Sequence, residues 1–235
     1  MRKKRAIAVL VVIVILAAGL TFYRIINSTT FQFFGTIINK VATDEKVVAL
    51  TFDDGPTEHT PEILAVLKDL NIPATFFVTG AELQQHMAYG SMIAQAGHEL
   101  GNHSYSHHRM LFTPLADVKR EIETTDSLIV KAGYTGRICF RPPYGKKLFS
   151  LPYYLAHNDR TTIMWDVAPD GDSNDQQAIT ERAVRNVLPG SVILLHVMFD
   201  GRIGSLHAVT DIVTRLQSEG YKFVTISQLL AYRKK

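Results

Sequence analysis

The sequence predicts an α/β fold in which parallel strands alternate with helices, in a sheet that is either open or closed into a barrel. Short runs of β-branched and aromatic residues alternate with longer stretches of helical periodicity from residue 47 onward. Polar, ionisable residues directly follow several of these runs, at the strand ends where a (β/α) barrel places its active site. Seven strand candidates indicate a barrel slightly smaller than the eight-stranded type.

Each predicted element is short, as expected for such a fold. The strand candidates are residues 47–52, 74–78, 98–102, 138–141, 162–167, 191–196 and 222–225. The helical candidates are residues 61–70, 82–96, 114–132, 178–187 and 208–219. Helical crossovers between strands favour parallel pairing, because each crossover returns the chain to the end of the sheet at which the previous strand began.

The N-terminus predicts a membrane anchor. An uncharged apolar run at residues 6–23 follows a basic cluster at residues 2–5. Eighteen helical residues span about 27 Å, close to a hydrocarbon core of about 30 Å and longer than a usual signal-peptide core. Basic residues stay in the cytoplasm, so the rest of the chain faces outward, or is secreted if the segment is cleaved. We expect residues 1–24 to be the anchor or signal segment, residues 25–44 a linker and residues 45–235 one folded domain.

Composition and charge argue against a nucleic-acid-binding protein and against a disulfide-stabilised one. The formal net charge is +3, and basic residues at the two chain ends contribute much of it. The body is slightly acidic, which argues against nucleic-acid binding. The lone Cys139 cannot form an intramolecular disulfide, and its apolar neighbours predict a buried side chain.

Two separated motifs together predict a metal-dependent hydrolase. Asp53 and Asp54 form an acidic turn, which alone is more often a cap or a solvated loop. His103 and His107 are four residues apart, so a helical turn would place both imidazoles on one face. Two His and one carboxylate are the ligand set of a catalytic zinc site, and the second carboxylate can accept the proton of an attacking water.

Two further segments carry groups suited to the same chemistry. Arg141 begins a rigid Pro-Pro-Tyr-Gly loop in which the Tyr144 amide could stabilise an oxyanion, although a surface loop with an exposed Arg explains the pattern equally well. His196 ends an apolar strand, where a His can donate a proton to a leaving amine or simply be structural.

Four ordered motifs give the chain a resemblance to a known family. TFDDGP at 51–56, HSYSH at 103–107, RPPYG at 141–145 and LLH at 194–196 resemble the polysaccharide deacetylases, also called the NodB-homology domain or carbohydrate esterase family 4. The resemblance extends over residues 46–230. It implies a distorted (β/α) barrel that removes acetyl groups from N-acetylated sugars and releases acetate.

The resemblance also implies a role for each matched residue. A divalent metal, zinc or else cobalt or nickel, would be held by Asp54, His103 and His107. Asp53 would be the general base that activates water, and Arg141 would orient it. The remaining implied groups are the oxyanion donor Tyr144, the acid His196 that protonates the leaving nitrogen, and the substrate-binding residues Tyr144, Trp165 and Leu194.

The chain departs from the family in one motif, which begins at Trp165. Ala168 stands where many members have an Asp, and no aromatic residue follows the later Asp. The acid that supports His196 or Arg141 must then be Asp166, Asp170 or Asp172. We favour Asp170 because the preceding Pro169 restricts the backbone, and the missing aromatic residue leaves substrate preference open.

The expected function is a membrane-anchored, extracytoplasmic N-deacetylase of peptidoglycan or chitin-like N-acetylglucosamine. One alternative is an O-acetyl esterase acting on a xylan-type polymer, and another is a catalytically silent glycan-binding protein of the cell envelope. An aspartyl phosphatase is disfavoured because its acids are usually two residues apart. We expect a monomer whose partners are the polysaccharide and the membrane, with no nucleic acid.

Overall fold

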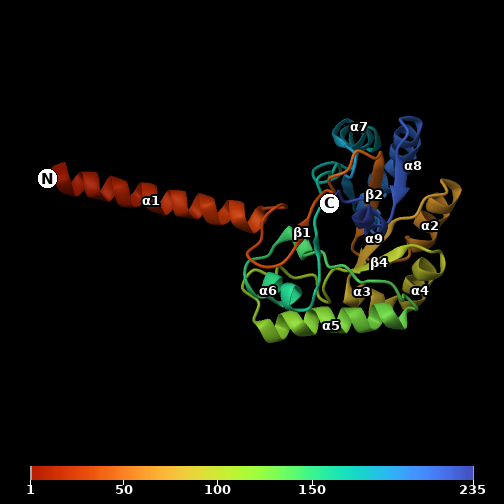
Figure 1. Ribbon diagram of the computed structural model, residues 1–235, viewed down its shortest axis with the longest axis horizontal. Helices are drawn as coiled ribbons and strands as arrows, with labels where there is room; N and C mark the ends of the chain where they lie inside the picture. Colours follow the sequence, from red (N-terminus) through yellow and green to blue (C-terminus); the bar gives the residue numbers. More distant parts are fainter. Residues whose placement is uncertain (1, 235) are drawn as a thin grey trace.

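The computed structural model describes residues 2–234 (Figure 1). At its centre is a strand that is buried along its whole length. This strand is β2 (Val47–Asp53). β6 (Val192–Leu195) pairs with one side of β2 in parallel. On the other side, β3 (Thr75–Val78) pairs with its C-terminal half and β7 (Lys222–Val224) with its N-terminal half. The central strand is therefore paired with three others.

The strands close into a distorted barrel. β4 (Glu99–Asn102) pairs with β3, and Phe140 bridges β4 to Thr162 of the short strand β5 (Thr162–Ile163). A few residues later, Val167 bridges to Ile193 of β6 and completes the ring. All these contacts are parallel, which confirms the predicted α/β barrel. The barrel is distorted because part of its wall is joined by single bridges.

Two strand predictions were too long in this part of the wall. Residues 138–141 contribute only the bridge at Phe140, because two prolines follow and cannot donate ladder hydrogen bonds. Residues 162–167 form a strand only over β5. The segment starts beside Phe140 and ends beside β6, so it cannot keep one ladder along its length.

Helices cover the outside of the barrel (Figure 1). The predicted ones are present, except that residues 82–96 form two helices broken at His86, whose backbone is not helical. These helices are α2 (Thr60–Asp69), α3 (Gly80–Gln85), α4 (Met87–Gln95), α5 (Leu115–Lys131), α7 (Gln176–Asn186) and α8 (Ile203–Ser218). The elements not predicted are all short: β1 (Ile37–Ile38), α6 (Ser150–His157), α9 (Ile226–Ala231) and the 3₁₀ turns Pro143–Gly145 and Asp200–Arg202.

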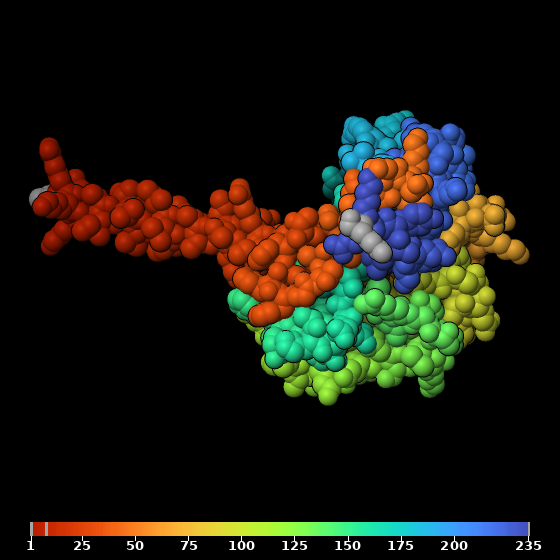
Figure 2. Space-filling model, in the orientation of Figure 1, coloured from red at the N-terminus to blue at the C-terminus, as the bar shows by residue number. Residues whose placement is uncertain are grey.

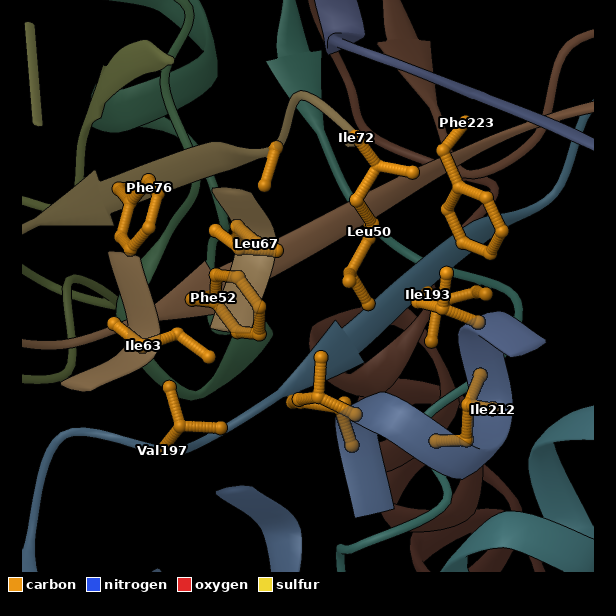
Figure 3. Packing of buried hydrophobic residues seen from close by; sticks show 14 of the residues in the cluster. Leu50, Phe52, Ile63, Leu67, Ile72, Phe76, Ile193, Val197, Ile212 and Phe223 are labelled. Atoms are coloured by element: carbon orange, nitrogen blue, oxygen red, sulfur yellow. The ribbon is translucent and has the colours of Figure 1, made fainter. Parts of the chain in front are cut away.

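Alternation along the strands separates an inner from an outer core. Outward residues such as Phe52 pack against Ile63 and Leu67 of α2 and the other helices, in the cluster shown in Figure 3. Inward residues such as Ala49 form a second cluster inside the barrel. That cluster includes Ile226 at the start of α9, so the barrel is filled rather than open. The polar residues that follow the strands lie at the opposite end of the barrel, at the C-terminal ends of the strands.

The N-terminal part of the chain extends away from this body. α1 (Arg2–Asn27) is the one helix within residues 2–234 that is long and apolar enough to cross a membrane, and a signal sequence would have the same character. The residues after it lie against the barrel, since β1 pairs with β5 and Val41 is buried. The division of the chain at residue 45 stays a prediction.

Candidate active site

The strand alternation brings the predicted polar residues to one end of the barrel. Thr51 faces inward and pairs in register with Leu194. Two residues further along each strand, Asp53 and His196 face the same way, at the C-terminal ends of β2 and β6. His103 follows β4 at the same edge, within ion-pair distance of Asp53.

Asp53 is buried between two cationic or potentially cationic partners. Its Oδ1 lies 2.5 Å from Arg141 Nη1, and its Oδ2 lies 3.5 Å from His103 Nε2. Burial alone would raise the pKa of Asp53, but the Arg141 guanidinium and His103 together hold this pKa below its ordinary value. Asp53 is therefore an ionised carboxylate, the form that accepts a proton.

Arg141 is completely buried and cannot reach outward to a ligand. Nη1 also donates to Thr51 Oγ1 at 2.9 Å, and Nη2 donates to the Met164 carbonyl at 3.2 Å. The guanidinium carbon lies 4.0 Å from the centre of the Phe77 ring. A buried charge needs such partners to offset its desolvation. Arg141 acts on the site by fixing the place and charge of Asp53.

Asp54, His103 and His107 form a group that fits a divalent metal. Asp54 Oδ1 lies 3.2 Å from His107 Nε2 and 3.9 Å from His103 Nε2, and the three donor atoms lie within 4.8 Å of one another. His103 Nδ1 lies 2.8 Å from the Arg141 carbonyl, to which it donates, so its Nε2 keeps the lone pair. Burial lowers the pKa of both His residues, which favours the neutral, metal-binding form.

The two His residues do not meet on a helix, so that part of the prediction was wrong. Residues 103–107 form a loop, and Ser104 and His107 have left-handed backbones, with φ of 65° and 56°. Asp54 and Tyr144 are also left-handed, at 70° and 57°. Such conformations cost roughly 1–3 kcal/mol each and cluster at functional sites.

Glu121 on α5 holds this loop, and the sequence alone did not identify it. One carboxylate oxygen accepts hydrogen bonds from the backbone N–H groups of Tyr105 and Ser106, at 2.9 and 2.8 Å. The other accepts from the Ser106 hydroxyl at 2.9 Å. The sequence feature that could have identified Glu121 is its position beside Val118 and Ile122, where an acid interrupts the apolar face of a helix.

Asp170 is the one of the three candidate acids that contacts His196. It is fully buried, lies 3.4 Å from His196 Nδ1, and accepts the His196 backbone N–H at 2.7 Å. Burial alone would lower the pKa of His196, but the hydrogen bond to Asp170 and the nearby acids raise it. Asp166 instead binds Ser191, and Asp172 pairs with Arg182 at the surface.

Tyr144, Trp165 and Leu194, the predicted substrate-binding residues, differ in exposure and in the residues they contact. Tyr144 is 54% exposed, and its ring centre lies 4.7 Å from that of His107. Within residues 2–234 its backbone N–H has no hydrogen-bond acceptor. The Trp165 ring centre lies 5.7 Å from the Arg141 guanidinium carbon, and Leu194 is buried beside Thr51.

The hollow beside the polar centre is small and open. A pocket of about 190 Å³ is lined by Asp54, His107 and Phe199, among others. A larger cavity of about 570 Å³ lies near Pro73 and His98, which precede β3 and β4. That cavity is at the opposite end of the strands, so we assign the chemistry to the smaller pocket, where the ionised and metal-binding groups are.

Comparison with known proteins identifies the family. The family model described as polysaccharide deacetylase matches residues 40–162. The chain belongs to the polysaccharide deacetylase family. A peptidoglycan-N-acetylglucosamine deacetylase of Bacillus cereus is 36% identical over 186 residues, which cover 77% of this chain and 67% of that relative.

Solved structures of polysaccharide deacetylases share the same fold. A peptidoglycan N-acetylglucosamine deacetylase superposes with a TM-score of 0.78 at 32% identity, over 84% of this chain and 93% of that chain. A carbohydrate esterase family 4 pseudoenzyme from Bacillus anthracis gives 0.76 at 27% identity, over 84% of this chain and 70% of that chain. Fold similarity within this family therefore does not by itself establish activity.

Proposed function

We propose that this polysaccharide deacetylase is a metal-dependent enzyme that hydrolyses N-acetyl groups of N-acetylglucosamine in peptidoglycan. The observation that carries the proposal is a buried Asp53, paired with Arg141, beside the donor group Asp54, His103 and His107. A general base beside three metal-ligating side chains is the arrangement that a metal-dependent hydrolase uses. The names of the similar relatives support peptidoglycan as the substrate.

Asp54, His103 and His107 would hold the metal. Two imidazoles and a carboxylate suit zinc, and cobalt or nickel accept the same donors. When bound, such an ion polarises the acetyl carbonyl and makes water more acidic. The hydrogen bond from His103 to the Arg141 carbonyl keeps the imidazole in the tautomer that leaves Nε2 available.

Asp53 is the proposed general base. It accepts a proton from the water that adds to the acetyl carbonyl carbon, and Arg141 keeps the carboxylate ionised and in place until then. Negative charge develops on the carbonyl oxygen as the water adds. The free backbone N–H of Tyr144 is the proposed donor to that oxygen.

His196 is the proposed general acid. It donates a proton to the sugar nitrogen as the carbon–nitrogen bond breaks, so that acetate and a free amino sugar are the products. Asp170 supports this step because its hydrogen bond raises the pKa of His196, which favours the protonated imidazole. Trp165 and Leu194 are proposed to contact the sugar and the acetyl methyl group.

The enzyme is proposed to act outside the cell membrane. α1 would cross the bilayer with its basic residues 2–5 in the cytoplasm, which leaves the barrel on the side of the peptidoglycan. The mass of the mature protein, measured in the membrane fraction and in the soluble extracytoplasmic fraction, tests this. An intact N-terminus supports an anchor, and a product that has lost α1 shows a cleaved signal sequence.

One experiment tests reaction, substrate and metal together. Acetate release is measured on peptidoglycan, chitin oligomers and acetylxylan, before chelation, after chelation and after zinc is returned. We expect release from the N-acetylated substrates that chelation abolishes and zinc restores. Release from acetylxylan alone would show an O-acetyl esterase. Glycan binding without release from any substrate would show a catalytically silent protein.

A further inference from the structure

Three segments that are distant in the sequence pack together where α1 joins the barrel. They are residues 22–42, 107–116 and 142–157, which we call the juxtamembrane surface. The rings of Phe22 and Phe112 stack with centres 6.3 Å apart, which joins the first segment to the second. Phe33 and Phe149 lie 4.6 Å apart and join the first to the third. A backbone bridge between Met110 and Lys147 joins the second to the third.

The juxtamembrane surface has an unusual charge. It contains five Lys and Arg residues and no Asp or Glu, although the chain has 22 Asp and Glu in total. Arg24 and Arg109 are exposed, and Lys146 is partly exposed. Such a surface attracts anionic lipid headgroups.

The same surface exposes aromatic side chains. Phe112 is 75% exposed, Phe149 is 52% exposed and Phe31 is 46% exposed. Phe33, Phe34 and Tyr153 are each about two-fifths exposed beside them. Exposed aromatic residues that gather in one place mark an interaction site, and aromatic rings together with basic residues are typical of membrane interfaces.

The position of α1 indicates which partner covers this surface. The apolar run of α1 ends at Tyr23, one residue after the ring that stacks on Phe112. The surface therefore begins at the level where the apolar run stops. Figures 1 and 2 show α1 leaving the side of the barrel on which the linker and α6 lie.

We propose that the juxtamembrane surface lies in the headgroup layer of the outer leaflet and docks the barrel onto the membrane. This inference rests on the proposal that α1 spans the bilayer, and it adds a fixed orientation to it. A flexible tether would let the barrel move away from the lipid. Here Lys147 is buried and donates to the Ser28 carbonyl at 2.5 Å, and Lys146 binds Asn27, so the barrel is held at the end of the helix.

Docking would also fix the position of the candidate active site relative to the membrane. Tyr144 belongs to the juxtamembrane surface and contacts His107 in the candidate metal group. It is two residues from Lys146, which binds the end of α1. The candidate site is therefore joined to the juxtamembrane surface through Tyr144 and His107, so docking would hold the site at a fixed place near the bilayer.

Depth-dependent quenching in the full-length protein tests the docking. Single Cys residues introduced by Phe112→Cys, Ile13→Cys and Val130→Cys are labelled with an environment-sensitive fluorophore, in vesicles of phosphatidylethanolamine and phosphatidylglycerol. The native Cys139 is 1% exposed and burial raises its pKa to about 12, so the unsubstituted chain is the control for unwanted labelling. Lipids carry a nitroxide either near the headgroup or deep in the acyl chain.

We expect the shallow nitroxide to quench the label at position 112 roughly two-fold or more, as for a group buried in the interface. The label at position 130 should be unaffected, because α5 carries it about 22 Å from the start of that helix. Absence of quenching at position 112 would overturn the docking. Position 13 reports separately on the span, since only an inserted α1 brings it near the deep nitroxide.

Discussion

Asp53 and Asp54 are neighbours in the chain with opposite electrostatic environments. Arg141 and His103 overcome the effect of burial on Asp53 and lower its pKa, whereas burial raises the pKa of Asp54. The left-handed backbone at Asp54 turns the two carboxylates to different neighbours. Asp53 pairs with the Arg141 guanidinium and lies near one imidazole, whereas Asp54 lies beside two imidazoles, so two identical side chains suit different tasks.

Replacing the proposed base tests this division of labour. Asp53→Asn should lower kcat for acetate release about 1,000-fold, because the amide cannot accept a proton. Metal affinity measured by titration calorimetry should change little, since Asp54, His103 and His107 remain. Unchanged turnover would remove Asp53 from the mechanism.

Replacing the acid beside His196 tests the proposed proton donor. The pKa of His196 is raised, and an imidazole donates a proton only below its pKa, so activity should fall as the pH rises through that value. Asp170→Asn removes the main cause of the raised pKa. The alkaline limb of the kcat/KM profile should then move to lower pH. Asp172→Asn, at the surface pair with Arg182, should leave the limb in place.

The loop at residues 103–107 and helix α5 act as one unit. The loop supplies both His donors, yet no regular ladder or helix holds its backbone. Glu121 provides that support through two backbone N–H groups and one hydroxyl. Groups behind a metal ligand commonly affect affinity 10- to 100-fold, by holding the ligand in position.

Weakening this support should therefore weaken metal binding. Glu121→Ala removes both acceptor oxygens and the three hydrogen bonds they accept, and we expect the metal Kd to rise about ten-fold in a chelator competition assay. Asp117→Asn on the same helix is the control, because Asp117 pairs with Arg120 at the surface. Equal affinity in the wild type and the Glu121 variant would show that the loop holds its own shape.

The whole barrel depends on contacts from the segment that precedes residue 45. β1 adds a strand beside β5, in the part of the wall that is otherwise joined by single bridges. Val41 is buried, and its N–H donates to the Gly190 carbonyl at 2.9 Å. The segment between the helix and β2 is thus part of the packing of the barrel.

Two truncations measure this contribution. A chain that begins at residue 45 should be less stable to urea than one that begins at residue 28, by on the order of 3 kcal/mol, because buried apolar area and strand pairing are lost. Both should bind metal, since the donors lie after residue 45. Equal midpoints of unfolding would support a domain that starts at residue 45.

The local sequence was sufficient for the fold class and for the residues that gather at the site. Polar residues that directly follow apolar strand candidates lie at the active-site end of an α/β barrel, so Asp53, His103 and His196 were predictable from their places after strands. Residues 138–141 and 162–167 were not correctly bounded. Their pairing depends on partners far away in the chain and on prolines that interrupt the ladder.

The sequence by itself determined an α/β fold of parallel strands, an apolar N-terminal helix and the chemistry available at one end of the strands. Periodicity and residue type are local properties, and these conclusions need nothing more. The tertiary structure decided that Asp170 is the acid beside His196, that Glu121 holds the His loop, and that residues 22–42 join two other acid-free segments in one surface. Each of these depends on distances between segments far apart in the chain, which only the folded packing sets.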